Sequence, residues 1–194
     1  MEERVARLKV KSILDLLLVL LYAPGKKGYK EPITGITRLE KLMFLFSKFS
    51  NTKIEDLEFE KHYYGPYSEA IYDVVQLATE NNLITLVEAQ NLPEYDLEVT
   101  QAEWGQKKEY FFKITKDGEK IAKILWENLS DEDKFLVLEL KRRFNRVPLR
   151  SLISLIYVKY PEYLEYSKLK DKISLFGITP DLPSFSRRDV WCHE

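Results

Sequence analysis

The residue types that usually carry out nucleophilic or acid–base chemistry are scarce in this chain and far apart. Its 194 residues include two histidines, His62 and His193, and one cysteine, Cys192. Catalysis of this kind needs several groups that converge on one point. Cys192 and His193 would also need ligands from elsewhere in the chain to hold a metal ion. We therefore expect His62 to be structural, the chain not to be an enzyme, and no metal site.

Cofactor motifs and a strong overall charge are also missing from the sequence. It has neither the Gly–Lys–Ser/Thr loop that cradles phosphates nor the glycine fingerprint of dinucleotide-binding folds. We expect no cofactor. The 30 basic and 31 acidic residues give a formal net charge of -1. No global field attracts a polyanion, so any contact with nucleic acid would need a local basic patch.

The most apolar segment is Ile13–Tyr22 (ILDLLLVLLY). It is shorter than the roughly 20 apolar residues that span a bilayer, and Asp15 interrupts it. Its apolar residues recur at helical spacing and also occupy the other faces. We expect a core helix that is buried on most sides, in a cytoplasmic protein without a membrane segment.

An aromatic turn is the most distinctive local feature. Tyr63, Tyr64 and Tyr67 surround Gly65 and Pro66, directly before a helical pattern. Tyrosines in such a turn pack inward with their hydroxyl groups at the edge of the core, or form a binding hot spot for a partner. Gly65 permits a positive φ angle. Both alternatives are compatible if the turn buries two rings and exposes the third.

The remaining pattern predicts a mainly α fold with a small β-hairpin. A capping box of Thr37 and Glu40 predicts the start of a second helix, and Thr115 and Ser130 are predicted N-caps further on. Helices are predicted at 13–22, 37–49, 116–128, 131–143 and 148–160, and strands at 83–87 and 109–114. A further helix, the third in the chain, is predicted to start at Pro66 or at Ser68 and to end at Glu80. This order is typical of a winged helix-turn-helix module. We expect a winged-helix domain at 1–128, a helical extension packed on it at 129–167, and a C-terminal tail at 168–194.

Two motifs resemble the YwgA-like and SocA-like (Panacea domain) proteins: residues 36–45 (ITRLEKLMFL) and residues 63–68 (YYGPYS). Residues 110–118 and 152–161 are also similar to elements of these winged-helix proteins. Glu40 stands where a glutamine is common, and Asn82 replaces a usual glycine. The resemblance implies a cytosolic, non-enzymatic regulator, since some members are antitoxins or adaptors that hold a toxin.

Charge distinguishes between the two functions that a winged helix suggests. The third helix, which would enter the major groove of DNA, contains Glu69, Asp73 and Glu80 and no lysine or arginine. The wing loop adds five carboxylates against Lys107 and Lys108. Because lysine and arginine supply most of the affinity for phosphate, binding of DNA through this helix is disfavoured. We expect a basic protein partner instead, on a surface made by Tyr63, Tyr64, Gly65, Pro66, Tyr67, Glu69, Tyr72, Asp73 and Gln76.

A basic corner keeps the DNA-binding alternative open. A transcriptional regulator would contact DNA there, through Lys141, Arg142, Arg143, Arg146 and Arg150. The same residues also complement the negative end of the helix that they terminate. A homodimer is compatible with either function.

Overall fold

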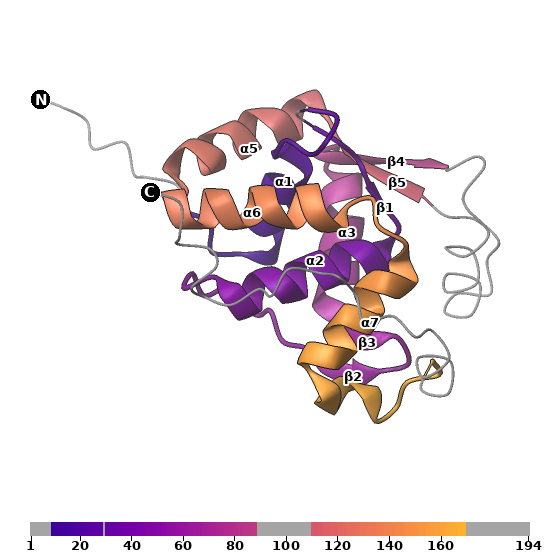
Figure 1. The fold of residues 1–194 in the computed structure, drawn as a ribbon. Coiled ribbons are helices and arrows are strands. Elements are labelled where there is room, and N and C mark those ends of the chain that lie inside the picture. Colours follow the sequence, from indigo (N-terminus) through magenta and orange to yellow (C-terminus); the bar gives the residue numbers. More distant parts are fainter. Residues whose placement is uncertain (1–8, 29, 89–109, 170–194) are drawn as a thin grey trace, which may run out of the picture.

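Helix α1, Ile13–Tyr22, lies at the centre of the fold and is buried on nearly all sides. The computed structural model describes residues 9–28, 30–88 and 110–169 (Figure 1). A capping box starts α1, because the Asp15 amide donates to the Ser12 hydroxyl and the Asp15 carboxylate accepts from the Ser12 amide. Around α1 pack α3, α5, α6 and strand β5. The predicted core helix is confirmed.

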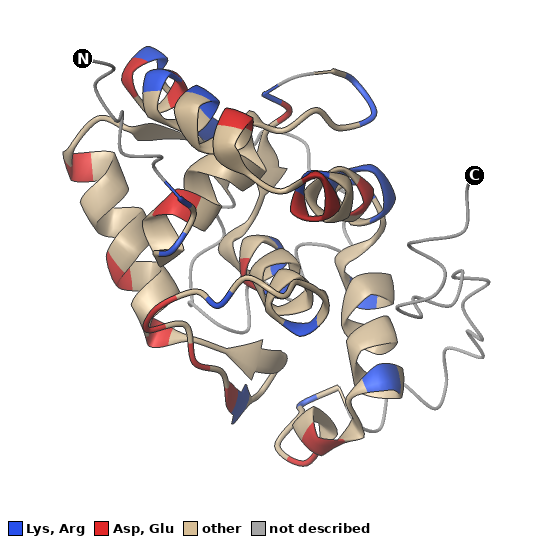
Figure 2. Cartoon of the chain, turned by 90° about the vertical axis from the view of Figure 1, so that its left-hand side faces the viewer, with Lys and Arg blue, Asp and Glu red and all other residues tan. Residues whose placement is uncertain are grey.

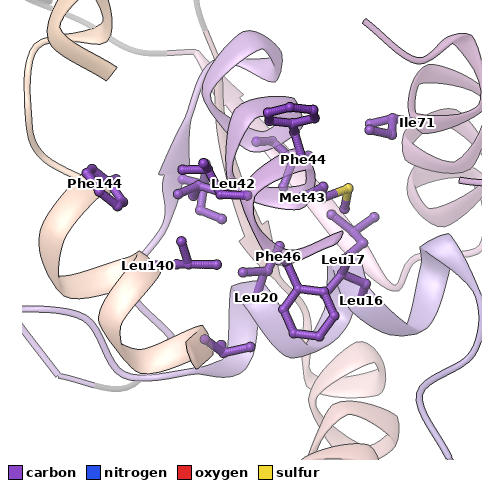
Figure 3. Close-up of a cluster of buried hydrophobic side chains, with 14 of the residues drawn as sticks. Leu16, Leu17, Leu20, Leu42, Met43, Phe44, Phe46, Ile71, Leu140 and Phe144 are labelled. Carbon is purple, nitrogen blue, oxygen red and sulfur yellow. The ribbon is translucent and has the colours of Figure 1, made fainter. Parts of the chain in front are cut away.

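Helix α2, Ile36–Phe49, forms the second half of the core. Its apolar side chains meet those of α1 and α6, as Figure 3 shows for Leu42, Phe46, Leu20 and Leu140. The predicted capping box of Thr37 and Glu40 is wrong. The N-cap is Gly35, with a φ angle of 76° and no side-chain cap, and both predicted residues are buried within the helix.

A three-stranded antiparallel sheet lies at one end of the molecule, with strand order β1-β5-β4 (Figure 1). The strands are β1 Ile33–Thr34, β4 Ile84–Glu88 and β5 Tyr110–Ile114. Strands β4 and β5 form the predicted hairpin, with Leu86 opposite Phe112. Strand β1 was not predicted. It pairs with β5, and the Gly35 amide donates to the Tyr110 carbonyl, so the sheet fixes the start of α2.

A second, two-stranded hairpin contains the aromatic turn. Strand β2, Glu60–His62, pairs with β3, Gly65–Tyr67, and helix α3, Glu69–Glu80, follows at once. Ser68 is the N-cap of α3, but its side chain makes no capping hydrogen bond. Asn82, with a φ angle of 54°, adopts a left-handed conformation after α3. The hairpin therefore joins α2 to α3 and sets where α3 begins.

The C-terminal helices are α5 Lys116–Asn128, α6 Asp131–Phe144 and α7 Leu149–Lys159, followed by the 3₁₀ helix η1 Pro161–Leu164. Thr115 and Ser130 cap α5 and α6 as predicted, each accepting a backbone N–H. Helix α6 packs on α1 and α2, and α7 packs on α2 and β3. The fold is mixed α and β. None of its helices, within the described ranges, has the length and apolar character needed to cross a bilayer.

Candidate partner-binding site

A buried ion pair holds the aromatic turn against α2. Lys41 Nζ lies 2.6 Å from Glu40 Oε2, and both side chains are 1% exposed. Lys41 Nζ also donates to the Pro66 carbonyl at 2.8 Å, and the Ser68 amide donates to Glu40 Oε1 at 2.9 Å. Because buried charges are stable only when they are paired and hydrogen-bonded, the pair fixes the turn and the start of α3 together.

Gly65 gives the turn a backbone conformation that favours glycine, and it lies beside this pair. Its φ angle is 96°, a conformation that side chains disfavour. A Cβ atom there would lie 3.6 Å from Lys41 Cε and 3.7 Å from Tyr157 Cε1. The turn is therefore held by α2 on one side and by α7 on the other.

The three tyrosines of the turn differ in exposure. Tyr64 is buried at 3%, Tyr67 is half-buried, and Tyr63 is 44% exposed. Gly65 and Pro66 are buried as well. Of the predicted partner-binding residues in the turn, Tyr63 and part of Tyr67 can therefore touch a partner, whereas Tyr64, Gly65 and Pro66 support the turn from inside.

Four aromatic rings form a continuous ladder from the turn to α3. The ring centroids of Tyr63 and His62 are 4.6 Å apart, those of His62 and Tyr67 are 4.7 Å apart, and those of Tyr67 and Tyr72 are 5.3 Å apart. We call Tyr63, His62, Tyr67 and Tyr72 the ring ladder. His62 lies inside this ladder, between two tyrosine rings, and no cluster of three His, Cys, Asp or Glu side chains suited to a metal ion occurs in the described ranges.

The segment after η1 closes over the Tyr63 end of the ring ladder. Lys168 Nζ lies 3.9 Å from the centroid of the Tyr63 ring, and the Lys168 amide donates to the Tyr63 carbonyl at 3.0 Å. The Tyr157 hydroxyl donates to Ser167 Oγ. Lys61 pairs with Glu165 at 2.5 Å, and the hydrogen bond to Glu165 raises the pKa of Lys61. We call residues 165–169 the strap.

The outer face of α3 is acidic. Glu69, Asp73, Gln76 and Glu80 are exposed, and Tyr72 is half-buried beside them. Helix α3 has three carboxylates and no lysine or arginine. In Figure 2, where Lys and Arg are blue and Asp and Glu are red, this helix carries red segments and no blue one. Leu77, 51% exposed, lies one residue after Gln76 on the same helix. The predicted residues of α3 therefore share a surface with the ring ladder through Tyr72.

The predicted basic corner is largely taken up by contacts within the protein. Lys141 is fully buried and donates to the Glu31 carbonyl at 2.5 Å. Arg146 Nε donates to the Glu31 carboxylate, and Arg143 Nε donates to Glu139 at 2.6 Å. Arg142 is exposed and Arg150 is half-buried. In this structure Lys141 is not available to a phosphate, and two of the arginines are held by carboxylates.

Burial changes the ionisation of Lys141. It lowers the pKa of this lysine from 10.5 to about 8, although the neighbouring Glu31 carboxylate acts in the opposite direction. Three further contacts hold the same region: Arg38 donates to the carbonyls of Phe144 and Val147, and Asn145 donates to the Pro32 carbonyl. The residues from Glu31 to Arg38 are thereby tied to the end of α6.

Several predicted residues lie outside the described ranges. These are Cys192, His193 and the residues of the predicted wing loop beyond Glu88, including Lys107 and Lys108.

Two features of the site were not predicted from the sequence. These are the Glu40–Lys41 pair, which holds the aromatic turn against α2, and the strap, which covers Tyr63. For the pair, the one available signal was the resemblance, which placed Lys41 in a motif without giving it a role.

Comparison with known proteins returned no match to a family model, to a curated protein or to a solved structure.

Proposed function

We propose that this chain is a non-enzymatic regulatory protein of winged-helix architecture, antitoxin-like or adaptor-like, that binds a basic protein partner through α3 and the ring ladder. The architecture is supported by the order of elements and by the sheet order β1-β5-β4. In a winged helix the first strand pairs with the last, as β1 pairs with β5 here. The β2–β3 hairpin is an addition between the second and third helices.

The acidic face of α3 carries this proposal. In a winged helix that binds DNA, the corresponding helix lies in the major groove. Each carboxylate close to a phosphate costs about 1 kcal/mol even at the dielectric constant of water. Helix α3 exposes Glu69, Asp73 and Glu80 and has no compensating cation. The same charges complement a partner rich in lysine and arginine.

The DNA-binding alternative through the basic corner has less support. Specific affinity for DNA depends on several cations that reach phosphates. Arg142 is exposed, whereas Lys141 is buried and Arg146 is bound to Glu31. We therefore place the partner on α3.

Photo-crosslinking tests the proposal at residue resolution. A benzoylphenylalanine residue replaces Gln76 on the exposed face of α3, or the exposed Lys123 of α5 as a matched control. We expect adducts with a basic protein from Gln76 and not from Lys123, and mass spectrometry identifies the partner. Equal adducts from both positions, or adducts only with acidic proteins, would contradict the proposal.

The same preparation tests the alternative. Fluorescence anisotropy with a short DNA duplex at physiological ionic strength should show no binding by the wild-type chain. Binding of the duplex that is lost in Arg142→Ala, together with no protein adduct at Gln76, would favour the DNA-binding function.

A further inference from the structure

The ring ladder already binds one cation of its own chain. The Lys168 ammonium group lies 3.9 Å from the centroid of the Tyr63 ring, within the roughly 6 Å over which a cation is attracted by the ring face. Tyr63 is 44% exposed and Lys168 is exposed too. The contact is therefore made at the surface, where a cation from another molecule can compete for it.

The other end of the ladder reaches the acidic face. Tyr67 and Tyr72 are in ring contact, and Tyr72 lies on α3 next to Asp73. Glu69 is exposed one turn before Asp73 on the same helix. Faces of aromatic rings beside carboxylates form an environment that is favourable for a lysine or arginine side chain.

From these two observations we infer that the ring ladder is a recognition strip for lysine or arginine side chains of the partner, and that Lys168 is an internal occupant which a partner side chain displaces from Tyr63. This inference rests on the proposed function, since it specifies the chemistry of the partner at that same surface. The strap remains attached during the exchange through the hydrogen bond from the Lys168 amide to the Tyr63 carbonyl. Only the lysine side chain has to move.

If Lys168 competes with the partner for Tyr63, removing its charge should raise the affinity for a basic peptide. Lys168→Gln removes the ammonium group and keeps the backbone hydrogen bond. A cation–π contact at an exposed site corresponds to a change of about two- to fivefold in affinity. We expect Lys168→Gln to bind a fluorescent peptide of alternating lysine and alanine residues two to five times more tightly than the wild type does.

Two control variants distinguish the loss of the contact with the Tyr63 ring from a change in the net charge of the protein. Lys48→Gln removes a cation that lies over Phe44, outside the ladder, and it changes the net charge equally. We expect this variant to bind as the wild type does. Lys168→Arg, which keeps a cation able to stack on the ring, should also bind as the wild type does.

A double-mutant cycle with Tyr63→Leu decides whether the ring is the shared site. We expect Tyr63→Leu to weaken binding of the peptide, and Lys168→Gln to give no gain in the Tyr63→Leu background. An equal gain in both backgrounds would overturn the inference, because Lys168 would then act by charge alone. Thermal unfolding of each variant verifies that it folds.

The outcomes separate this inference from the proposed function. If the peptide binds with equal affinity to the wild type, Lys168→Gln and Tyr63→Leu, the ladder is not the recognition strip, although an acidic docking face survives. If neither the wild type nor Lys168→Gln binds the basic peptide, the inference and the proposed function are both overturned. Tighter binding of an apolar peptide or a DNA duplex than of the basic peptide would overturn the inference in favour of that other occupant.

Discussion

Glu40 and Lys41 are neighbours in the sequence, and their charged groups meet at 2.6 Å inside the protein, where Lys41 binds the aromatic turn and Glu40 binds the start of α3. Lys41 binds the Pro66 carbonyl and Glu40 binds the Ser68 amide. One turn of α2 thus fixes the backbone on both sides of Tyr67. The position of α3, and with it the position of the acidic face, depends on these two side chains.

Removing one member of this pair should be more harmful than removing both. Lys41→Met leaves Glu40 buried without its cation, and we expect the free energy of unfolding to fall by about 3–5 kcal/mol. The double variant Glu40→Gln, Lys41→Met should recover part of this loss, because no net charge is then buried. Urea unfolding measures both, and an exposed control, Lys120→Met, should change stability by less than about 1 kcal/mol. A loss for the double variant at least as large as that for Lys41→Met would contradict this role.

Lys141 should make stability depend on alkaline pH. Its pKa is about 8 in the folded protein and 10.5 in an unfolded chain. The unfolded state therefore binds more protons between these values, and the contribution of Lys141 to stability rises as the pH rises from about 8 to 10.5. The full difference corresponds to about 3 kcal/mol. Because other groups titrate in this window, the measurement is the difference between wild type and Lys141→Met in urea unfolding at each pH. For the exposed control Lys123→Met we expect the difference from the wild type in free energy of unfolding to stay constant from pH 7 to 10.5. A constant difference for Lys141→Met as well would exclude a titration of Lys141 in this range.

Gly118 should be required although it lies in a helix. Alanine in place of glycine usually stabilises a helix by up to about 1 kcal/mol. Here a Cβ atom would lie only 2.0 Å from the Leu83 carbonyl oxygen, and a backbone atom cannot easily move away. We expect Gly118→Ala to destabilise the fold by about 1–3 kcal/mol, as over-packing does. Thermal unfolding of Gly118→Ala and of the control Lys120→Ala in the same helix shows whether the change in stability is negative. If Gly118→Ala were more stable than the wild type, α5 would be able to shift away from β4.

Reversing charge on α3 should abolish binding without harming the fold. Glu69 and Asp73 are exposed, and Glu69 is in the first turn of α3, so Glu69→Lys with Asp73→Lys should change the free energy of unfolding by no more than about 1 kcal/mol for each substitution. We expect the affinity for the lysine–alanine peptide to be lost, while the same two substitutions at the exposed Asp131 and Glu132 of α6 leave it unchanged. Equal effects of the two pairs would mean that only the net charge of the protein matters.

The sequence predicted those elements whose signals are local. The caps Thr115 and Ser130 and the residue patterns of β4 and β5 lie next to or within the elements that they define, and these predictions were confirmed. Strand β1 has only two residues and exists through its pairing with β5, about 80 residues later, so no local pattern announces it. The capping-box prediction failed for the same reason, because pairing of the chain at Gly35 decides where α2 starts.

Of the candidate site, the sequence predicted the acidic face and the tyrosine turn but not how they are held. Lysine is rarely buried, so Lys41 and Lys141 were not expected in the core. For Lys141 a signal existed: it falls on the apolar stripe of α6 with Leu136, Val137, Leu140 and Phe144. The contact between the ring ladder and the strap joins Tyr63 to Lys168, about 100 positions later, and no spacing rule within one element reveals such a contact.

The ties between the Glu31–Arg38 region and the end of α6 also bear on how the chain matures. Their members are separated by 106 to 115 positions in the chain. Closing loops of this length is slow, because entropy is lost before the contacts form. While the polypeptide is being synthesised, these contacts of Glu31 and Arg38 cannot form until the residues from Lys141 to Val147 have left the ribosome. About three-quarters of the chain, up to Arg146, must therefore be synthesised before the Glu31 carboxylate gains this partner.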